Sequence, residues 1–369
     1  MTAMSIGIIG CGNISPAYLN YLKDSSVVQV TALADLLPEK AKDRAKEYGI
    51  ERVYTVEEML QSPDIDIILN LTIPASHAAI NIAALDHGKH VYAEKPLSIS
   101  LEDARRTLEL AEAKQLRVGC APDTFLGTGL ETSRKAIQEG RIGRPVAAAA
   151  FMMGAGPEGW HPNPDFFYEE GGGPMFDMGP YYLTALVNLL GPITRISSSA
   201  QSLLPERIVK SGPRAGTRIP VHTPTHLSGT LDFADGAVGT LITSFDIPGG
   251  STLPRIEIYG TEGSLLVPDP NCFDGEVKLR RHDQEDWSIV PPAFAGRSDN
   301  ERGKGIEDMA RAILENREHR ASGKLAYHVL EAMHAFLASS REGRHIHLDS
   351  ASSLQLASAY RIADQALLV

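Results

Sequence analysis

The stretch SIGIIGCGNIS, residues 5–15, decides the fold of the first third of the chain. A short apolar run ends in a glycine turn, and the turn opens into SPAYLNYLK, which has the composition of a helix. In turns of the form GxGxxG, the first glycine permits a tight bend, the second lets the backbone approach a diphosphate, and the third position must be small. Gly10, Gly12 and Ser15 occupy these three positions.

The start of the following helix completes this pattern. Backbone amides at Asn13 and Ile14, at the positive end of the helix dipole, are predicted to hold the diphosphate of a dinucleotide. Asp35 lies 20 residues beyond Ser15, at the end of the next apolar run, where an acid accepts hydrogen bonds from ribose hydroxyls. The alternative is that these residues form an ordinary strand, turn and helix that bind no cofactor.

The residues around Asp35 bear on the choice of cofactor. A carboxylate at this position repels a 2′-phosphate, and Leu36 and Leu37 supply no cation for one. NAD is therefore favoured over NADP, although Lys40 and Arg44 follow closely.

The first third of the chain alternates strand-like and helix-like segments. Apolar runs at 5–10, 27–35, 65–72, 89–94 and 115–120 alternate with amphipathic segments that include 38–49, 77–88 and 101–114. This alternation predicts a doubly wound parallel sheet with helices on both faces.

The pattern changes after about Cys120. A helix at 129–139 leads to strand-like runs at 193–200, 225–233, 237–245, 255–260, 263–268, 276–281 and 287–290, which are separated by turn residues. Helices at 305–316, 324–343 and 353–367 follow, and 203–225 is the most loop-like segment. We therefore predict an α/β domain over 1–122 and an α+β domain with a mostly antiparallel sheet over 123–369.

The composition restricts the class of protein. A chain of 369 residues exceeds the usual size of one core, and it is 43% hydrophobic and 22% charged. Its net charge of −11 disfavours nucleic acid and anionic lipid as partners. No apolar run approaches the roughly 20 residues that span a bilayer. The N-terminus does not read as a signal peptide, and three scattered cysteines favour neither disulfides nor a metal cluster. We expect a cytoplasmic protein without a metal site.

Two further loops follow strands of the first domain, at the edge where ligands of such sheets gather. LTIPASH carries Thr72, Pro74 and His77, and AEKP carries Glu94 and Lys95. All five are candidate cofactor-binding residues. A cis Lys-Pro bond would re-aim the lysine into a cleft. The alternatives are a surface histidine and a solvated lysine.

The second domain contains a segment of unusual composition, GGGPMFDMGPYYLTALVNLLG, residues 171–191. On a helix at about 100° per residue, Asp177, Tyr181, Thr184 and Asn188 fall along one stripe, opposite a leucine-rich face. The glycines would let the loop pass close to a bulky neighbour, such as the nicotinamide end of a cofactor. The alternative for Asp177 is an N-cap, and the tyrosines could be packing residues.

In their order along the chain, the glycine turn, Asp35, TxPxxxH and EKP resemble the Gfo/Idh/MocA oxidoreductases. The resemblance covers essentially the whole chain. It implies a Rossmann domain followed by a domain with a large open sheet, dependence on NAD(P), sugar or polyol substrates, and homodimers or homotetramers built on that sheet.

The resemblance also assigns site residues. In that family the lysine of EKP, here Lys95, lies at the nicotinamide and substrate, and an Asp-x-Gly-x-His segment supplies further groups. Asp177 matches the aspartate, whereas Tyr181 stands in place of histidine and Thr184 in place of a second acid. Asp123 lies where the family places substrate contacts.

The chemistry suggests roles for these residues. Oxidation of an alcohol needs a group that accepts the hydroxyl proton, and a tyrosine with a pKa of about 10 needs a nearby cation for this task. We hypothesise that Lys95 and Tyr181 handle the proton and that Asp177 orients the substrate or Lys95. A rival base is His161, in the aromatic loop EGWHPNPDFFYEE, which could form a wall of a sugar site. Asp123, His161 and Thr184 are the candidate substrate-binding residues.

The sequence thus predicts an NAD-dependent dehydrogenase of a sugar, cyclitol or related polyol. Two alternatives remain open at this point. One is a redox-neutral glycosidase with tightly held NAD, and the other is a noncatalytic NAD-binding regulator in which the altered motif marks lost chemistry.

Overall fold

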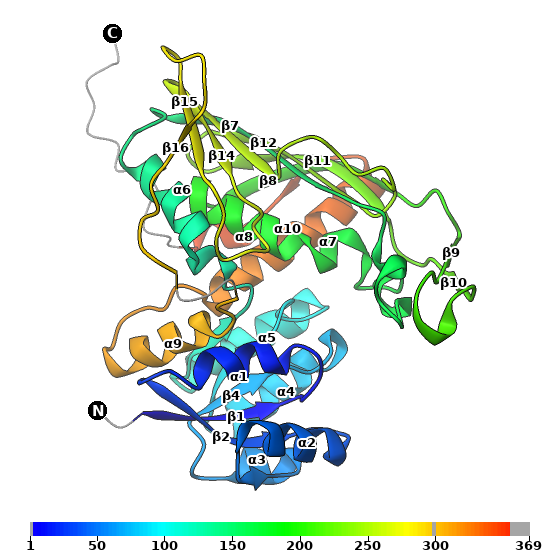
Figure 1. Cartoon of the computed structure of the whole chain (residues 1–369), viewed down its shortest axis with the longest axis vertical. Coiled ribbons are helices and arrows are strands. Elements are labelled where there is room, and N and C mark those ends of the chain that lie inside the picture. Colours follow the sequence, from blue (N-terminus) through cyan, green and yellow to red (C-terminus); the bar gives the residue numbers. More distant parts are fainter. Residues whose placement is uncertain (1–2, 297–299, 355–369) are drawn as a thin grey trace. The chain divides into compact units, whose positions relative to one another are not determined.

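The computed structural model describes residues 3–296 and 300–354, and its chain divides into two compact units (Figure 1). The first unit comprises Met1–Leu126 and Arg297–Leu330, and the second comprises Gly127–Gly296 and Glu331–Val369. The predicted second domain covers all of 123–369. The structure instead groups 297–330 with the first unit, because helix α9 (Lys304–Leu314) packs against its last strand.

The first unit contains a six-stranded sheet in the order β3-β2-β1-β4-β5-β6, and every neighbouring pair is parallel. The strands are β1 (Met4–Ile9), β2 (Val28–Ala34), β3 (Arg52–Val53), β4 (Ile67–Asn70), β5 (His90–Ala93) and β6 (Val118–Cys120). The helices between them are α1 (Ser15–Leu22), α2 (Pro38–Tyr48), α3 (Val56–Gln61), α4 (Pro74–Asp86) and α5 (Leu101–Ala113). This strand order is that of the Rossmann fold.

The burial of the central strands explains their apolar runs. Ile6 and Ile8 of β1 and Ile67, Ile68 and Leu69 of β4 have no exposed surface. Successive side chains point to opposite faces of a strand, so both faces of this sheet are covered. The predicted doubly wound sheet is confirmed. Helix α3 is not among the predicted elements, and a capping box of Thr55 and Glu58 begins it.

The second unit is built on a nine-stranded sheet in the order β16-β15-β14-β13-β7-β12-β11-β8-β17. These strands are β7 (Pro145–Met153), β8 (Ile193–Gln201), β11 (His226–Phe233), β12 (Val238–Ser244), β13 (Ile256–Gly260), β14 (Gly263–Val267), β15 (Lys278–Arg281), β16 (Ser288–Ile289) and β17 (Ile346–His347). Only the β7–β12 pair is parallel among the pairs within this sheet in the described residues. The predicted large, mostly antiparallel sheet is confirmed.

Helices cover one face of this sheet (Figure 1). They are α6 (Thr128–Gln138), α8 (Gly179–Leu190) and α10 (Gly323–Glu342), and the short α7 (Gly173–Asp177) precedes α8. Ser198 of β8 ties the sheet to α10, since its hydroxyl donates to the Phe336 carbonyl over 2.5 Å. The leucine-rich face of α8 is buried as predicted, with Leu183, Leu186 and Val187 fully covered.

A small lobe extends this unit. The loop-like segment 203–225 contains a two-stranded antiparallel ribbon of β9 (Glu206–Ile208) and β10 (Arg218–Pro220). Phe167, Tyr168, Val209, Ile219 and Phe245 form a core beneath the ribbon. The predicted helix at 353–367 lies, beyond residue 354, outside the described residues.

Candidate active site

The glycine turn after β1 has the geometry that the sequence predicts. Gly10 has a φ of +103°, and a Cβ at this position would lie 2.6 Å from the Leu71 carbonyl and 2.8 Å from the Thr72 nitrogen. Only glycine fits this backbone and this contact. A Cβ on Gly12 would meet no atom within 4 Å, so this side of the turn faces open space. The turn therefore leaves room for a ligand to approach its backbone.

The start of α1 suits an anion. No side chain caps the helix at Ile14, and Pro16 lies in the first turn. The buried Ser15 donates its hydroxyl to the Gly12 carbonyl over 2.8 Å. First-turn amides without a side-chain acceptor, together with the helix dipole, favour a phosphate group. These features fit a dinucleotide diphosphate.

Asp35 is held firmly at the end of β2. One carboxylate oxygen accepts from the Cys11 amide at 2.7 Å, and the other accepts from the Leu37 amide at 2.8 Å. Each oxygen retains acceptor capacity for a further donor, such as a ribose hydroxyl. Burial, and then Asp35, raise the pKa of the Cys11 thiol to about 12, so this thiol stays protonated within the turn.

The surroundings of Asp35 are mainly apolar. Leu36 is 90% exposed and Leu37 is 56% exposed. Lys40 and Arg44 lie within electrostatic reach of the turn, since both lower the pKa of Cys11. One terminal guanidinium nitrogen of Arg44 is paired with Glu47 at 2.5 Å, which partly neutralises the cation that a 2′-phosphate would need. This arrangement favours NAD.

His77 anchors the two loops that follow β4 and β5. Its side chain is fully buried, with Nδ1 2.6 Å from the Pro96 carbonyl and Nε2 3.0 Å from the Thr72 carbonyl. Burial lowers the pKa of this histidine. Asn70 supports the same arrangement, because its amide accepts from the Thr72 hydroxyl at 2.7 Å and donates to the His77 carbonyl at 3.1 Å. His77 thus joins the loops, and it is placed away from the surface that a cofactor could touch.

The lysine loop is held at its other end by Glu94. The Lys95–Pro96 bond is cis, as the sequence suggested. One Glu94 oxygen accepts from the Tyr18 hydroxyl at 2.8 Å, and the other accepts from the Lys95 backbone amide at 2.9 Å. The residues on both sides of Lys95 are therefore held in place, Glu94 by Tyr18 and Pro96 by His77.

Asp123 has a structural role that differs from the predicted substrate contact. It is 1% exposed, and one of its oxygens accepts from the amides of Gly303 and Gly305 at 3.0 and 2.9 Å. These bonds cap the start of α9. Burial raises the pKa of Asp123 to about 6.

The predicted polar stripe of the second unit spans two helices. Asp177 ends α7, and Tyr181 lies in the first turn of α8, whose N-cap position is held by Met178 without a side-chain bond. Asp177 is therefore not the N-cap of α8. Tyr181 is 8% exposed and Thr184 is 3% exposed, so both side chains of the stripe are buried.

The glycine run before α7 passes close to backbone of its own unit. A Cβ on Gly172 would lie 2.7 Å from the carbonyls of Phe166 and Phe167, and one on Gly173 would lie 2.8 Å from the carbonyl of Pro224. The bulky neighbour predicted for this loop is the nicotinamide end of a cofactor. Protein backbone fills that place at these two glycines.

The aromatic loop forms a cluster around His161. Trp160 and Phe166 are 66% and 53% exposed, and their rings meet His161 edge-on at 5.5 and 5.3 Å between centroids. His161 Nδ1 accepts the Asn163 amide at 3.1 Å, so the neutral ring carries its proton on Nε2.

A buried charged network anchors this loop. Arg207 is 6% exposed and Glu158 is 1% exposed, and they form an ion pair at 3.1 Å. Arg207 also pairs with Asp246, and the Tyr168 hydroxyl donates to Glu158. Both terminal guanidinium nitrogens of Arg207 are engaged, which favours one arrangement of the surrounding side chains, although its Nε is buried without a hydrogen-bond partner among the described residues. These contacts therefore hold the aromatic loop in one position relative to the ribbon of β9 and β10.

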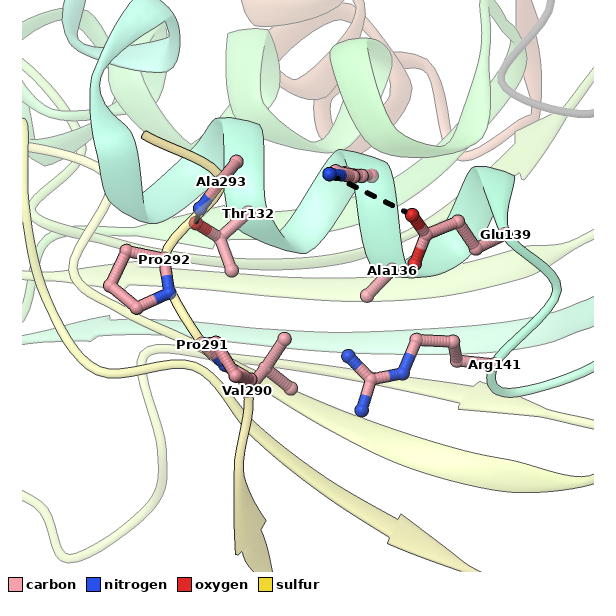
Figure 2. A pocket seen from close by; sticks show the side chains of 9 residues that line it. Thr132, Ala136, Glu139, Arg141, Val290, Pro291, Pro292 and Ala293 are labelled. Atoms are coloured by element: carbon pink, nitrogen blue, oxygen red, sulfur yellow. Dashed lines mark hydrogen bonds and ion pairs between the residues drawn. The ribbon is translucent and has the colours of Figure 1, made fainter. Parts of the chain in front are cut away.

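A pocket of about 210 Å³ lies elsewhere in the second unit (Figure 2). Its walls are α6 and the segment after β16. The Glu139 carboxylate forms an ion pair with the Lys135 ammonium at 3.8 Å, marked by the dashed line in Figure 2. The lining residues are Thr132, Lys135, Ala136, Glu139, Arg141, Val290, Pro291, Pro292 and Ala293. None of the residues predicted from the sequence lines this pocket.

The structure brings together the candidates of the first unit along one edge of its sheet. The turn after β1, Asp35 after β2, Thr72 after β4 and Lys95 after β5 all follow the carboxyl ends of parallel strands. Asp177, Tyr181, Thr184 and His161 belong to the second unit. Tyr18 and Asn70 are not among the residues predicted from the sequence. A polar amide at the end of the apolar run IILN was the available signal for Asn70.

No helix in the part of the chain that the structure describes combines the length and the apolar character that a membrane crossing requires. Within 3–296 and 300–354, no three potential metal ligands come together.

The fold and the nucleotide turn define an oxidoreductase with an NAD-binding Rossmann domain. Residues 4–121 match the family description "Oxidoreductase family, NAD-binding Rossmann fold", and residues 130–266 match the "GFO/IDH/MocA C-terminal domain". The chain belongs to the Gfo/Idh/MocA family of oxidoreductases, and it is a dehydrogenase acting on CH–OH groups.

Named relatives agree with this assignment. The chain is 32% identical over 323 residues to the dTDP-3,4-didehydro-2,6-dideoxy-alpha-D-glucose 3-reductase of Saccharopolyspora spinosa, covering 83% of this chain and 90% of the relative. It is 29% identical over 295 residues to the 1,5-anhydro-D-fructose reductase of Ensifer adhaerens, covering 78% of this chain and 83% of the relative. A levoglucosan dehydrogenase solved with NADH and L-sorbose shares the fold, with a TM-score of 0.80 at 23% identity over 95% of this chain and all of that one.

Proposed function

We propose that the protein transfers a hydride between NAD and a hydroxyl-bearing carbon of a sugar, cyclitol or related polyol. The observation that carries this proposal is the carboxyl edge of the first sheet, where the Gly10 turn and Asp35 stand beside a lysine loop that is held at both ends. Ligands of open α/β sheets bind at this edge.

The nature of the substrate is inferred from the relatives and from the aromatic loop. The relatives are named for an anhydro-sugar, a nucleotide-linked deoxy sugar and levoglucosan. The exposed rings of Trp160 and Phe166 offer flat apolar surface on which the apolar face of a sugar ring could stack. Both features support a polyhydroxy substrate.

The chain must handle one proton in this reaction. When bound, NAD accepts or returns the hydride, and the protein takes or gives the proton of the hydroxyl. We propose that Tyr181 exchanges this proton, that the Lys95 ammonium stabilises the tyrosinate, and that Asp177 orients the substrate hydroxyl. A tyrosine with a pKa of about 10 needs such a cation to act near neutral pH.

We also propose that the protein forms a homodimer or homotetramer through the sheet face that helices leave open. Val238, Ala147 and Tyr259 lie in one row across β12, β7 and β13, and Val238 and Tyr259 are 48% and 37% exposed. Exposed apolar side chains on such a row suit contact with a second copy. Light scattering after size-exclusion chromatography tests this, and a monomer at micromolar concentration would reject it.

A substrate panel tests the main proposal. Sugars, polyols and glycosides are offered with NAD and with NADP, and the absorbance of reduced cofactor is recorded together with product analysis. Net NADH formed with a free sugar or polyol supports the proposal. Glycoside cleavage without net NADH identifies a redox-neutral enzyme instead. NAD binding without turnover across the panel would indicate a regulator and would contradict the proposed activity.

A further inference from the structure

We infer that Tyr18 is a positioning residue for Lys95 and that it acts through Glu94. This inference rests on the proposed role of Lys95, and it concerns only residues of the first unit. Tyr18 lies on α1, the helix that begins at the glycine turn, and its side chain has no exposed surface.

The contacts form a short chain from α1 to the lysine loop. The Tyr18 hydroxyl donates to one Glu94 oxygen over 2.8 Å, and the Lys95 amide donates to the other over 2.9 Å. The Glu94 amide donates to the Asn70 carbonyl over 2.9 Å, so the backbone before Lys95 is also fixed to β4. A carboxylate with both oxygens engaged has little freedom to rotate. The hydroxyl therefore fixes the carboxylate, and the carboxylate fixes the backbone of Lys95.

The contact is suited to a constant positioning role. Burial, and then Glu94, raise the pKa of Tyr18 well above 10, so the hydroxyl remains a donor throughout the working pH range. Hydrogen bonds to charged groups are among the stronger ones in proteins. On the far side of Lys95, the Pro96 carbonyl is held by His77 at 2.6 Å. Loss of the Tyr18 bond would free only the Glu94 side of the loop.

The same helix offers a matched control. Tyr21 is also buried, and its hydroxyl donates to Glu307 over 2.9 Å. Tyr18→Phe and Tyr21→Phe each remove one tyrosine–glutamate hydrogen bond from α1, yet only the first touches the lysine loop. Damage to α1 itself would appear in both variants, whereas a positioning effect would appear in one.

The first measurement is independent of activity. Hydrogen exchange of the Lys95 amide, followed in the whole protein without cofactor by mass spectrometry of a short peptide covering 91–98, in which Lys95 lies well inside the peptide, reports the Glu94 contact directly. We expect Tyr18→Phe to accelerate this exchange about tenfold, from the loss of one hydrogen bond to a charged group. Tyr21→Phe should leave it unchanged. Equal exchange in both variants overturns the inference.

The second measurement separates kcat from binding. Tyr18→Phe should lower kcat about tenfold, while the Kd for NAD and the KM for substrate stay within about twofold. If Tyr18 acts only through Glu94, Glu94→Ala and the double variant Tyr18→Phe/Glu94→Ala should share one kcat. Additive losses in this cycle, or a normal kcat in Tyr18→Phe, overturn the inference.

A third variant distinguishes failure of this inference from failure of the proposed function. If Lys95→Met keeps normal turnover, the proposed role of the lysine is wrong, and with it any positioning by Tyr18. If Lys95→Met is inactive but Tyr18→Phe equals Tyr21→Phe, only the positioning inference fails.

Discussion

The replacement Asp35→Ala tests the cofactor site most directly. In the structure each carboxylate oxygen already accepts one backbone amide, from Cys11 at 2.7 Å and from Leu37 at 2.8 Å. The remaining acceptor capacity is what we assign to two ribose hydroxyls. A hydrogen bond to a charged group contributes at least about 1.5 kcal/mol. The loss of two such bonds therefore raises the Kd for NAD roughly 100-fold.

The same variant should also lose stability, since the two amides lose their acceptor. At this half-buried position we expect a loss of about 1–2 kcal/mol in the free energy of unfolding. Asp66→Ala is the matched control. Asp66 accepts the Ser5 amide at 2.8 Å beside the start of β1, at the amino edge of the same sheet, so its removal takes away the same charge and a similar bond.

Isothermal titration calorimetry with NAD, combined with urea unfolding, measures both quantities. Asp66→Ala should bind NAD like the wild type, and Asp35→Ala should not. The cofactor assignment would be refuted by a folded Asp35→Ala protein whose Kd for NAD lies within about threefold of the wild-type value.

Four further predictions concern single side chains. Tyr181→Phe should lower kcat by about 100-fold or more with the Kd for NAD retained, and near-normal turnover would reject Tyr181 as the proton-handling group. Asp123 has its pKa raised from 3.8 to about 6, so it contributes stability that is present below pH 3.8 and lost as pH rises through 6. Asp123→Asn, which keeps an acceptor for α9, should therefore raise the free energy of unfolding at pH 8 by up to about 3 kcal/mol, with a smaller gain at pH 5; Asp123→Ala should lower it at both. Burial lowers the pKa of His328 from 6.5 to about 4, so the stability that the neutral histidine contributes is present above pH 6.5 and lost as pH falls to 4. His328→Leu should therefore reduce the fall in the free energy of unfolding over this pH range by up to about 3 kcal/mol, as measured by urea titrations. Tyr92→Phe, which removes a buried hydroxyl without a hydrogen-bond partner in the described residues, should leave the melting temperature unchanged or raise it, and a clear drop would show that the hydroxyl has a partner such as water.

Much of the fold could be predicted because its signals are local. The alternation of apolar runs and amphipathic segments predicts strands and helices directly. The turn with a positive φ is predicted by the glycine that forms it. Asp35 could be assigned because its spacing from the turn follows from one strand and one helix. The altered motif at Tyr181 was visible for the same reason.

The long-range partners could not be predicted in this way. Asp123 accepts the backbone amides of Gly303 and Gly305, some 180 positions later in the chain. Tyr18 and Glu94 are separated by 76 positions, and Gly173 meets Pro224. Such contacts depend on how finished elements pack against one another, and neither periodicity nor turn chemistry encodes that packing.

The amino-acid sequence by itself determined the Rossmann domain, the preference for NAD and the candidate residues, because backbone conformation and side-chain spacing are short-range properties. The tertiary structure alone decided which of those residues are buried anchors. His77 joins two loops, Asp123 caps a helix and Glu94 holds the lysine backbone, since only folding determines which donors and acceptors meet away from water.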